Sequence, residues 1–544
     1  QPADPGQAGT PFEGEKIFLD AQFWIFTTSH ATRGLGVTHG LPIWRVNDDG
    51  TLAVHNSHPP TVALLEYAAA LFVGPVPAAA RWPALLFSLG MLAVMYALLR
   101  RAFPKMAACL GVVGLVAQPM FFHFATCPEV FLLGHLPLLA LLFYGTTSNA
   151  AAVWWHRPAV LAGLAALCVA ISYATLGVMA LWVLAWTVTR RNRAAWLDAA
   201  AVLGGAVLAL SLLLLWLHLG GGSVSHWAER GLLRSLGSQP DRPDLAADPV
   251  VTWSALMDHQ VTWFFKGAGW LAWLGLIGLG LVIAGLFRKE DSAAASTPPA
   301  ADSMVPGAPS AVLEASADTK AAPPSRTPRT LQLELLIAFA LMFLCEACLI
   351  RQNAFTHAYS VASGGFLIAF GLAAIGEQGA RGFQAIGQRR RMQTHQLIGI
   401  ILSIATLGAI YRLTDVLDEQ VALTSQNDMT AMATAIDKAQ SEHPHQPVLV
   451  YDTWLLPAQT VTGTDLPANQ GYIFPWFYRG RAFLCYRQPD RNAGASESAA
   501  RPGVILWPAK VPLSPTVQAE LQQQGFHELT LGGVSIYTLP TAAP

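Results

Sequence analysis

The chain has 544 residues, of which 53% are hydrophobic and only 12% are charged, and its mean hydropathy is +0.40. A soluble protein of this length needs more charge to cover its surface, so the composition indicates a polytopic α-helical membrane protein. The formal net charge of −1 gives no global positive field, and we therefore expect no nucleic acid among its partners.

The six cysteines give no sign of a disulfide framework. They stand at positions 109, 127, 168, 345, 348 and 485, mostly inside apolar runs. Cys345 and Cys348 share a membrane segment, but the sequence around them lacks the further ligands that a metal site needs. We interpret all six as small core residues.

The chain begins with a polar stretch that shows no signal peptide and no membrane anchor. Asp20 opens a segment with a helical pattern that ends at Gly34. His58-Pro59-Pro60 then leads into the apolar segment 61–73, which carries Glu66. Because a spanning helix needs about 20 apolar residues, we predict that 61–73 is a helix lying in the membrane interface.

Ten membrane spans are predicted from the longer apolar runs, with 158–188 divided into two short helices near Ser172-Tyr173. The predicted spans are 82–99, 106–122, 130–146, 158–172, 174–188, 197–218, 264–287, 333–350, 358–377 and 395–412.

Positive charges gather in alternate loops if 61–73 does not cross the membrane. One set of loops then holds Arg100, Arg101 and Lys105; Arg190, Arg191 and Arg193; Arg288 and Lys289; and Arg381 with Arg389, Arg390 and Arg391. Loops rich in Lys and Arg face the cytoplasm. The N-terminal stretch, the loop 219–262 and the C-terminal region are therefore predicted to share the outer side.

These patterns divide the chain into five predicted parts. They are a first outer loop with interfacial helices (1–79), a first part of the transmembrane core (80–289), a disordered cytoplasmic linker rich in Ala, Pro and Ser (290–330), a second part of the core (331–413) and a small outer α/β domain (414–544). In the last part, strands are predicted at 448–451 and 504–507, helices at 428–442 and 514–524, and a hairpin formed by 527–531 and 534–539 around Gly532-Gly533.

The order of motifs in the first third of the chain has a specific resemblance. An acidic first loop, His-Pro-Pro, an interfacial helix and Ala80-Arg81-Trp82-Pro83 precede a membrane helix that ends at Leu99-Arg100-Arg101. This order resembles the polyprenyl-phosphate-dependent glycosyltransferases of the GT-C fold. The nearest groups are the dolichyl-phosphate-mannose protein mannosyltransferases and their bacterial relatives, which include aminoarabinose transferases acting on lipid A. The resemblance is densest over 15–150 and returns at 353–364.

The resemblance implies a general base in the first loop. In that family a carboxylate just after the first membrane helix acts as the general base or as a metal-linked carboxylate that orients the acceptor, and Asp20 matches it by spacing. The family usually has Asp-Glu, whereas Ala21 follows here, and Glu15 and Glu13 are the alternative bases. The layout also leads us to expect a membrane helix upstream of Gln1. The alternative for Asp20 is a structural role as a helix cap.

Several residues are candidates for binding the lipid phosphate or the sugar. The guanidinium groups of Arg81 and Arg351 suit a phosphate, because their planar fork donates two parallel hydrogen bonds. The resemblance adds His58, His357 and Tyr359 as substrate contacts. Each has a structural alternative: His58 braces the turn before the interfacial helix, and the other four anchor helix ends at the interface.

Two further carboxylates stand near the outer ends of predicted spans. Glu129 follows Cys127-Pro128 and is a candidate for holding a substrate amine or, with Asp20, a divalent cation such as Mg²⁺ or Mn²⁺. The alternative is a first-turn residue favoured by the helix dipole. Glu346 lies inside a span, where an ionisable residue is costly and therefore a functional candidate.

The sequence thus predicts an inverting glycosyltransferase of the bacterial inner membrane with its site on the periplasmic face. Its donor would be a polyprenyl-phosphate-linked sugar, its acceptor a lipid, protein or glycan, and membrane lipids would surround it. A flippase or transporter of lipid-linked sugars is the main alternative, although transporters tend to show repeated halves that are missing here. The third alternative is a non-catalytic scaffold of an envelope-polysaccharide system.

Overall fold

The structure is a computed structural model of the whole chain. It describes residues 23, 26–27, 29–31, 33–46, 52–55, 58–74, 77–147, 156–235, 252–287, 328–348, 358–385, 448–450, 504–508, 519, 522–523, 525–531 and 534–538. Everything stated below about the structure refers to these residues.

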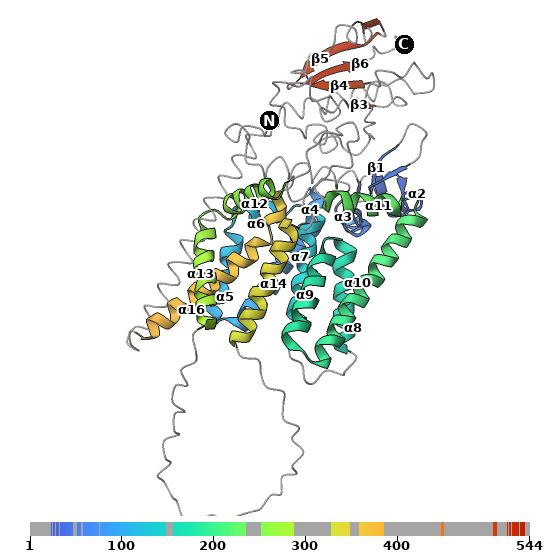
Figure 1. The fold of residues 1–544 in the computed structure, drawn as a ribbon. Coiled ribbons are helices and arrows are strands. Elements are labelled where there is room, and N and C mark those ends of the chain that lie inside the picture. Colours follow the sequence, from blue (N-terminus) through green and yellow to red (C-terminus); the bar gives the residue numbers. More distant parts are fainter. Residues whose placement is uncertain are drawn as a thin grey trace, which may run out of the picture.

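Most of the described chain forms one helical bundle (Figure 1). We call the end where α3, α11 and α12 lie the upper end, and the opposite end, toward which α7 and α10 extend, the lower end. The bundle helices are α4 (Pro77–Ala102), α5 (Lys105–Val116), α6 (Pro119–Phe124), α7 (Val130–Gly145), α8 (His156–Ile171), α9 (Thr175–Arg190), α10 (Arg193–Leu219), α13 (Leu271–Phe287), α14 (Pro328–Cys348) and α16 (Gly364–Ala385).

Shorter elements gather at the upper end. The described residues of 23–33 are helical and end at Gly34, whose φ of +80° lies in the left-handed region. The other elements are α2 (Leu35–Thr38), the antiparallel pair β1 (Ile43–Val46) and β2 (Leu52–Val54), α3 (Pro60–Val73), α11 (Val224–Ser235), α12 (Trp253–Ala268) and η2 (Ala358–Val361). The predicted helix at 61–73 is confirmed as α3, whereas the β1–β2 pair was not predicted.

Three described helices, α4, α10 and α14, are long and apolar enough to cross a membrane, or four spans result if the bent pair α12 and α13 counts as one. Shorter apolar helices, including α7, α8 and α9, stand beside them. The predicted number of about ten spans stays a prediction, and the predicted span at 395–412 lies outside the described residues.

Three predicted spans are wrong as continuous helices. The predicted span 358–377 begins with the 3₁₀ helix η2 and a turn at 362–363, and its α-helix starts only at Gly364. The segment 264–287 is broken after Ala268, and the axes of α12 and α13 differ by 102°. Gly269 at this break has a φ of +60°, which favours glycine and ends the helix. The segment 106–122 is broken between α5 and α6, because Gln118 is extended and Pro119, the first residue of α6, cannot donate a backbone hydrogen bond.

Glycines allow some helices of the bundle to touch through their backbones. A Cβ added to Gly278 of α13 would lie 1.9 Å from the carbonyl oxygen of Gly371 in α16, and one added to Gly371 would lie 2.1 Å from that of Gly275. In the same way, a Cβ on Gly205 of α10 would lie 2.2 Å from the Ala162 oxygen in α8. Such small-residue contacts are typical of helix packing in membranes, where close van der Waals packing replaces the hydrophobic effect.

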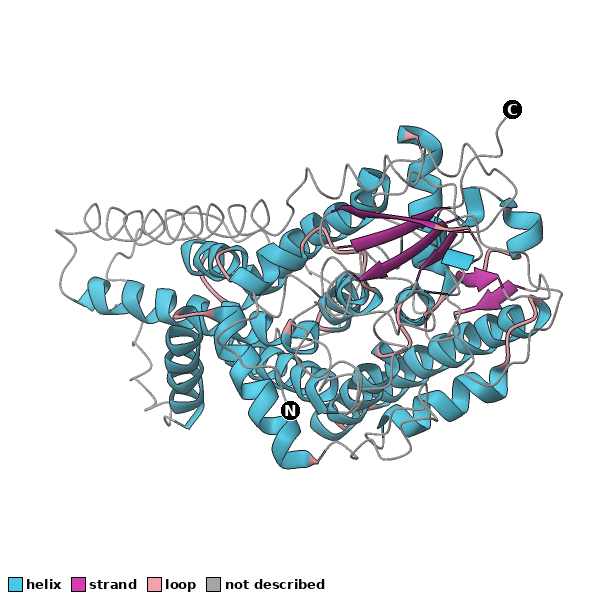
Figure 2. Cartoon of the chain, turned by 90° about the horizontal axis from the view of Figure 1, so that it is seen from above, coloured by secondary structure: helices cyan, strands magenta, loops and turns pink. Residues whose placement is uncertain are grey.

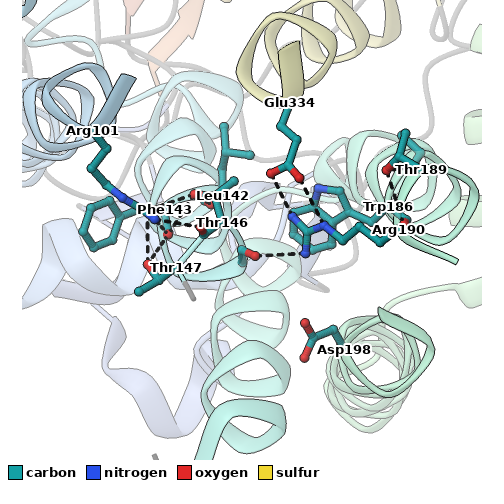
Figure 3. A network of polar contacts seen from close by, with 12 residues as sticks. Arg101, Leu142, Phe143, Thr146, Thr147, Trp186, Thr189, Arg190, Asp198 and Glu334 are labelled. Carbon is teal, nitrogen blue, oxygen red and sulfur yellow. Dashed lines mark hydrogen bonds and ion pairs between the residues drawn. The ribbon is translucent and has the colours of Figure 1, made fainter. Parts of the chain in front are cut away.

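Three arginines from different helices converge on the last turn of α7 at the lower end. Arg101 of α4 donates to the Thr146 carbonyl oxygen at 2.7 Å (Figure 3). Arg157 of α8 and Arg190 of α9 both donate to the Gly145 carbonyl oxygen, at 3.0 and 3.2 Å. Carbonyl groups at the end of a helix lack partners within it and carry the negative end of its dipole, so these cations stabilise α7.

Two carboxylates complete this lower-end network. Asp198 of α10 accepts from the Arg157 Nε and Nη2 groups at 3.0 and 2.8 Å. Glu334 of α14 accepts from Arg190 at 3.0 Å (Figure 3). The sequence predicts that the charge clusters around Arg101 and Arg190 share one side, and the structure brings these two residues to the same end of α7.

The C-terminal part contributes one four-stranded sheet, which Figure 1 shows beyond the upper end. Its strand order is β3-β4-β6-β5, with β3 parallel to β4 and the other pairs antiparallel. Figure 2, seen from above, shows this sheet and the β1–β2 pair over the helices. The predicted strands and hairpin are confirmed as β3 (Val448–Val450), β4 (Val504–Pro508), β5 (His527–Leu531) and β6 (Val534–Thr538). The predicted helix at 428–442 lies outside the described residues.

Candidate functional site

A small hydrophobic cluster joins the first loop to the bundle at the upper end. Phe23 and Phe26 of the N-terminal helical segment pack with Val62 of α3, Ala84 of α4 and Val130 of α7, and all five are at most 2% exposed. The two phenylalanine rings meet edge to face with centroids 5.5 Å apart. Chain segments that carry His58, Arg81 and Glu129 therefore lead into one packed group, which we call the first-loop cluster.

His58 lies beside this cluster, in the turn that starts α3. Pro59 has the extended backbone of an N-cap residue and Pro60 occupies the first helical turn, where its missing N–H costs nothing. The His58 ring lies 5.4 Å from the Phe23 ring and stacks on the His55 ring at 4.7 Å. The proline pair thus holds the imidazole of His58 at the edge of the N-terminal segment, which fits both its bracing role and a substrate contact.

One face of α4 links the remaining two candidates. Arg81 precedes the buried Ala84 by about one helical turn, so it stands on the same face just beyond the first-loop cluster, and its side chain is half-buried. One turn further on, the Ser88 hydroxyl donates to the Ala125 carbonyl oxygen at 2.7 Å. This bond fixes the short connection that leads to Glu129.

Glu129 is fully buried at the start of α7. Its carbonyl oxygen accepts from the Leu133 N–H at 3.0 Å, which is the first hydrogen bond of the helix. A carboxylate in this position is favoured by the positive end of the helix dipole. The geometry therefore agrees with the structural alternative for Glu129, and it also places the carboxylate beside Val130 in the first-loop cluster.

A second buried carboxylate, Glu66 of α3, fastens the N-terminal segment. Its Oε2 accepts from the Thr27 hydroxyl at 2.8 Å, and both side chains are at most 1% exposed. These residues are 39 positions apart, so the bond determines how the N-terminal segment lies on α3. The sequence marks Glu66 only as the single charge of an apolar helix, and it gives no signal for Thr27.

His30 is buried in the same region. Its Nδ1 lies 2.9 Å from the Thr38 hydroxyl oxygen and its ring meets the Tyr67 ring edge-on at 5.8 Å. Burial lowers the pKa of His30 from 6.5 to about 4, because the interior disfavours the charged form. The imidazole is therefore neutral in the folded protein at neutral pH.

This burial predicts a loss of stability in mild acid. The folded pKa lies below the unfolded value, so the unfolded state binds more protons between pH 6.5 and about 4, and stability is complete only above pH 6.5. Lowering the pH from 7 to 5 should cost about 2 kcal/mol through this residue. Thermal unfolding of the purified protein at both pH values measures the loss, and His30→Gln should remove most of this difference. An equal pH dependence in the variant would contradict the assignment to His30.

The other predicted site residues cannot be placed in this geometry. Asp20, Glu15, Arg351 and His357 lie outside the described residues. Tyr359 belongs to η2, of which only the backbone is described at that position. Next to it, Ser360 and Gln260 exchange hydrogen bonds at 3.1 and 3.2 Å, and these bonds join η2 to α12.

Among the described residues, no three His, Cys, Asp or Glu side chains are grouped closely enough to hold a metal ion. Of the two predicted cation ligands, Asp20 and Glu129, only Glu129 lies within the described residues. The expected divalent cation therefore stays a prediction.

Comparison with known proteins identifies the fold. No protein-family model matches the sequence, and no curated protein matches it in sequence. Among solved structures, the chain is similar to ArnT from Cupriavidus metallidurans bound to undecaprenyl phosphate, with a TM-score of 0.58 and 12% identity over 98% of this chain and 97% of that one. The apo state of the same protein gives a TM-score of 0.58 and 13% identity over the same shares.

A more distant similarity is found to the apo oligosaccharyltransferase of Archaeoglobus fulgidus, with a TM-score of 0.46, 12% identity, and coverage of 97% of this chain and 71% of that one. At these identities the ArnT comparison shows the fold alone. It confirms the predicted resemblance to GT-C-fold glycosyltransferases, over nearly the whole chain.

Proposed function

We propose that this protein is an integral-membrane glycosyltransferase that moves a sugar from a polyprenyl phosphate to an acceptor at the upper end of the bundle. The observation that carries the proposal is the first-loop cluster, which draws the segments of His58, Arg81 and Glu129 together in a chain with the GT-C fold. The undecaprenyl phosphate bound to ArnT supports a carrier of the same chemical class.

The lower-end network supports the orientation. Positively charged residues of membrane proteins accumulate on the cytoplasmic side, and Arg101, Arg157 and Arg190 all lie at the lower end. The upper end then faces the periplasm of a bacterial inner membrane. A lipid-linked sugar in the outer leaflet would reach the first-loop cluster from the bilayer, and the acceptor, a lipid, protein or glycan, would approach from water.

Asp20 is the proposed general base. It precedes Phe23, a member of the first-loop cluster, by three residues in the sequence. The acceptor oxygen or nitrogen attacks the anomeric carbon while the bond from that carbon to the phosphate oxygen breaks. The proton of the acceptor passes to the carboxylate, and the lipid phosphate leaves with the bonding electrons. A single displacement inverts the anomeric centre. Glu15 is the alternative base.

The leaving phosphate needs cationic and hydrogen-bonding partners as its charge develops. Arg81 is the described cation best placed for this role, because it stands on the α4 face beside the first-loop cluster. We assign His58 to the same phosphate, and Arg351, His357 and Tyr359 to the donor. Glu129 is assigned to the substrate or, together with Asp20, to a divalent cation.

Transfer from a radiolabelled undecaprenyl-phosphate sugar by the purified protein in proteoliposomes tests the proposal. We expect wild-type transfer and, for Arg81→Gln, a donor KM raised about tenfold or more, since a hydrogen bond to a charged group contributes about 1.5–3 kcal/mol. Arg100→Gln, at the lower end of the same helix, is the matched control and should keep the wild-type KM. Movement of the lipid-linked sugar across the bilayer without any product would instead support a transporter.

A further inference from the structure

A buried polar pair connects two bundle helices away from the proposed site. His135 of α7 has its Nε2 at 2.9 and 3.0 Å from the two carboxylate oxygens of Glu346 in α14. The side chains are 2% and 5% exposed, and the residues are 211 positions apart. Phe366 of α16 meets the imidazole edge-on at 5.3 Å, so a third helix closes the pair from the side.

Such a pair is costly in a membrane protein. An ionisable side chain inside the bilayer loses its hydration, and a buried pair adds little net stability compared with apolar side chains of similar size. The surrounding core is apolar, with Met342, Phe339 and Leu138 fully buried nearby along the same helices. Because the His135–Glu346 pair adds little stability, we attribute it to the position it fixes. The contact forms at only one alignment of α7 and α14 along their axes.

The positions of the two residues show which geometry that is. His135 follows Glu129 by six residues, so it lies about 9 Å further along the α7 axis than Glu129. Glu346 stands two residues before the last residue of α14. The chain then continues through residues 349–357, which include Arg351 and His357, to η2 and Tyr359. Within the described residues, η2 contacts both α14 and α7. The pair therefore ties α14 and η2 to the helix that begins just after Glu129.

We propose that His135 and Glu346 are positioning residues, which hold the upper end of α14, and with it η2, against the N-terminal half of α7 so that the donor site keeps its geometry. This inference rests on the proposed function and names the donor phosphate as the group that depends on the pair. Neither residue contacts the substrate in this account.

Kinetics of paired variants test the role. Glu346→Ala should raise the donor KM about tenfold and leave kcat within about twofold, whereas Glu346→Gln keeps an acceptor for the imidazole and should restore the wild-type KM. The matched control is Asp198→Asn, which weakens a buried ion pair of the same kind at the lower end and should leave the donor KM unchanged.

A second variant covers the case in which Glu346→Ala does not accumulate. His135→Phe with Glu346→Leu replaces the pair by apolar side chains and leaves no buried charge, so it should fold and still show the raised KM. An unchanged donor KM in this double variant, or an equal rise in the Asp198→Asn control, would overturn the positioning role.

Hydrogen–deuterium exchange separates this inference from the proposed function, since it needs no activity. Backbone amides of residues 358–363 should exchange about tenfold faster in the double variant than in the wild type, and those of α8 and α10 should not change. Faster exchange in a protein that transfers no sugar would uphold the positioning of this segment and reject the enzyme. Transfer by the wild type with unchanged exchange and KM in the variant would uphold the enzyme and reject the inference.

Discussion

Replacement of Asp20 by Asn should lower kcat for sugar transfer about 10²- to 10⁴-fold, which is the range that general-base catalysis contributes. The amide has nearly the shape of the carboxylate but cannot take the acceptor's proton. The donor KM should change little, because the phosphate is assigned to Arg81, His58 and the residues near η2. Initial rates with a radiolabelled polyprenyl-phosphate sugar, measured on equal amounts of protein in proteoliposomes, give both constants.

Glu15→Gln is the matched control for this experiment, since it removes a carboxylate of the same loop. It should keep a rate close to that of the wild type. A large loss in Glu15→Gln with normal transfer by Asp20→Asn would move the base to Glu15. Normal transfer by both variants would remove the proposed base from the first loop.

The second large effect concerns stability. Asp198→Ala should lower the free energy of unfolding by about 3–5 kcal/mol, because it leaves the Arg157 guanidinium largely buried without its carboxylate partner. Arg157 also holds the end of α7 through the Gly145 carbonyl group, so the loss should spread to α7 and α8. Equilibrium unfolding of the purified protein in detergent measures the change.

Arg381→Ala is the control for that measurement. Arg381 forms an ion pair with Glu377 one turn away on α16, but its side chain is 60% exposed. Exposed pairs of this kind contribute about 0.3–0.5 kcal/mol. Equal losses for Asp198→Ala and Arg381→Ala would show that the buried lower-end network contributes no more than a surface pair.

Local sequence patterns were sufficient to predict several elements at the correct places. His58-Pro59-Pro60 starts α3 as predicted, because the prolines fix the backbone without any help from distant residues. The strands β5 and β6 flank Gly532-Gly533, a turn signal that acts over a few residues. Charge patterning likewise predicted that Arg101 and Arg190 lie at one end, since that rule depends on composition and not on packing.

Contacts between distant segments could not be predicted. Nothing in the sequence indicates that Thr27 donates to Glu66 or that His135 meets Glu346, because each contact depends on how whole helices pack. Both carboxylates did stand out as charges in apolar segments, so the sequence marks one partner of each pair and gives no signal for the other. The break after Ala268 was missed for a related reason: hydropathy measures apolar length and does not respond to the backbone angle of Gly269.

We propose that the lipid phosphate binds at the upper end of the bundle, beside the first-loop cluster. Photo-crosslinking with a polyprenyl phosphate that carries a diazirine close to its phosphate, followed by peptide mapping, tests this directly. We expect labelling of peptides that contain His58 or Arg81. Labelling confined to the lower-end peptides that contain Arg101, Arg157 or Arg190 would contradict it.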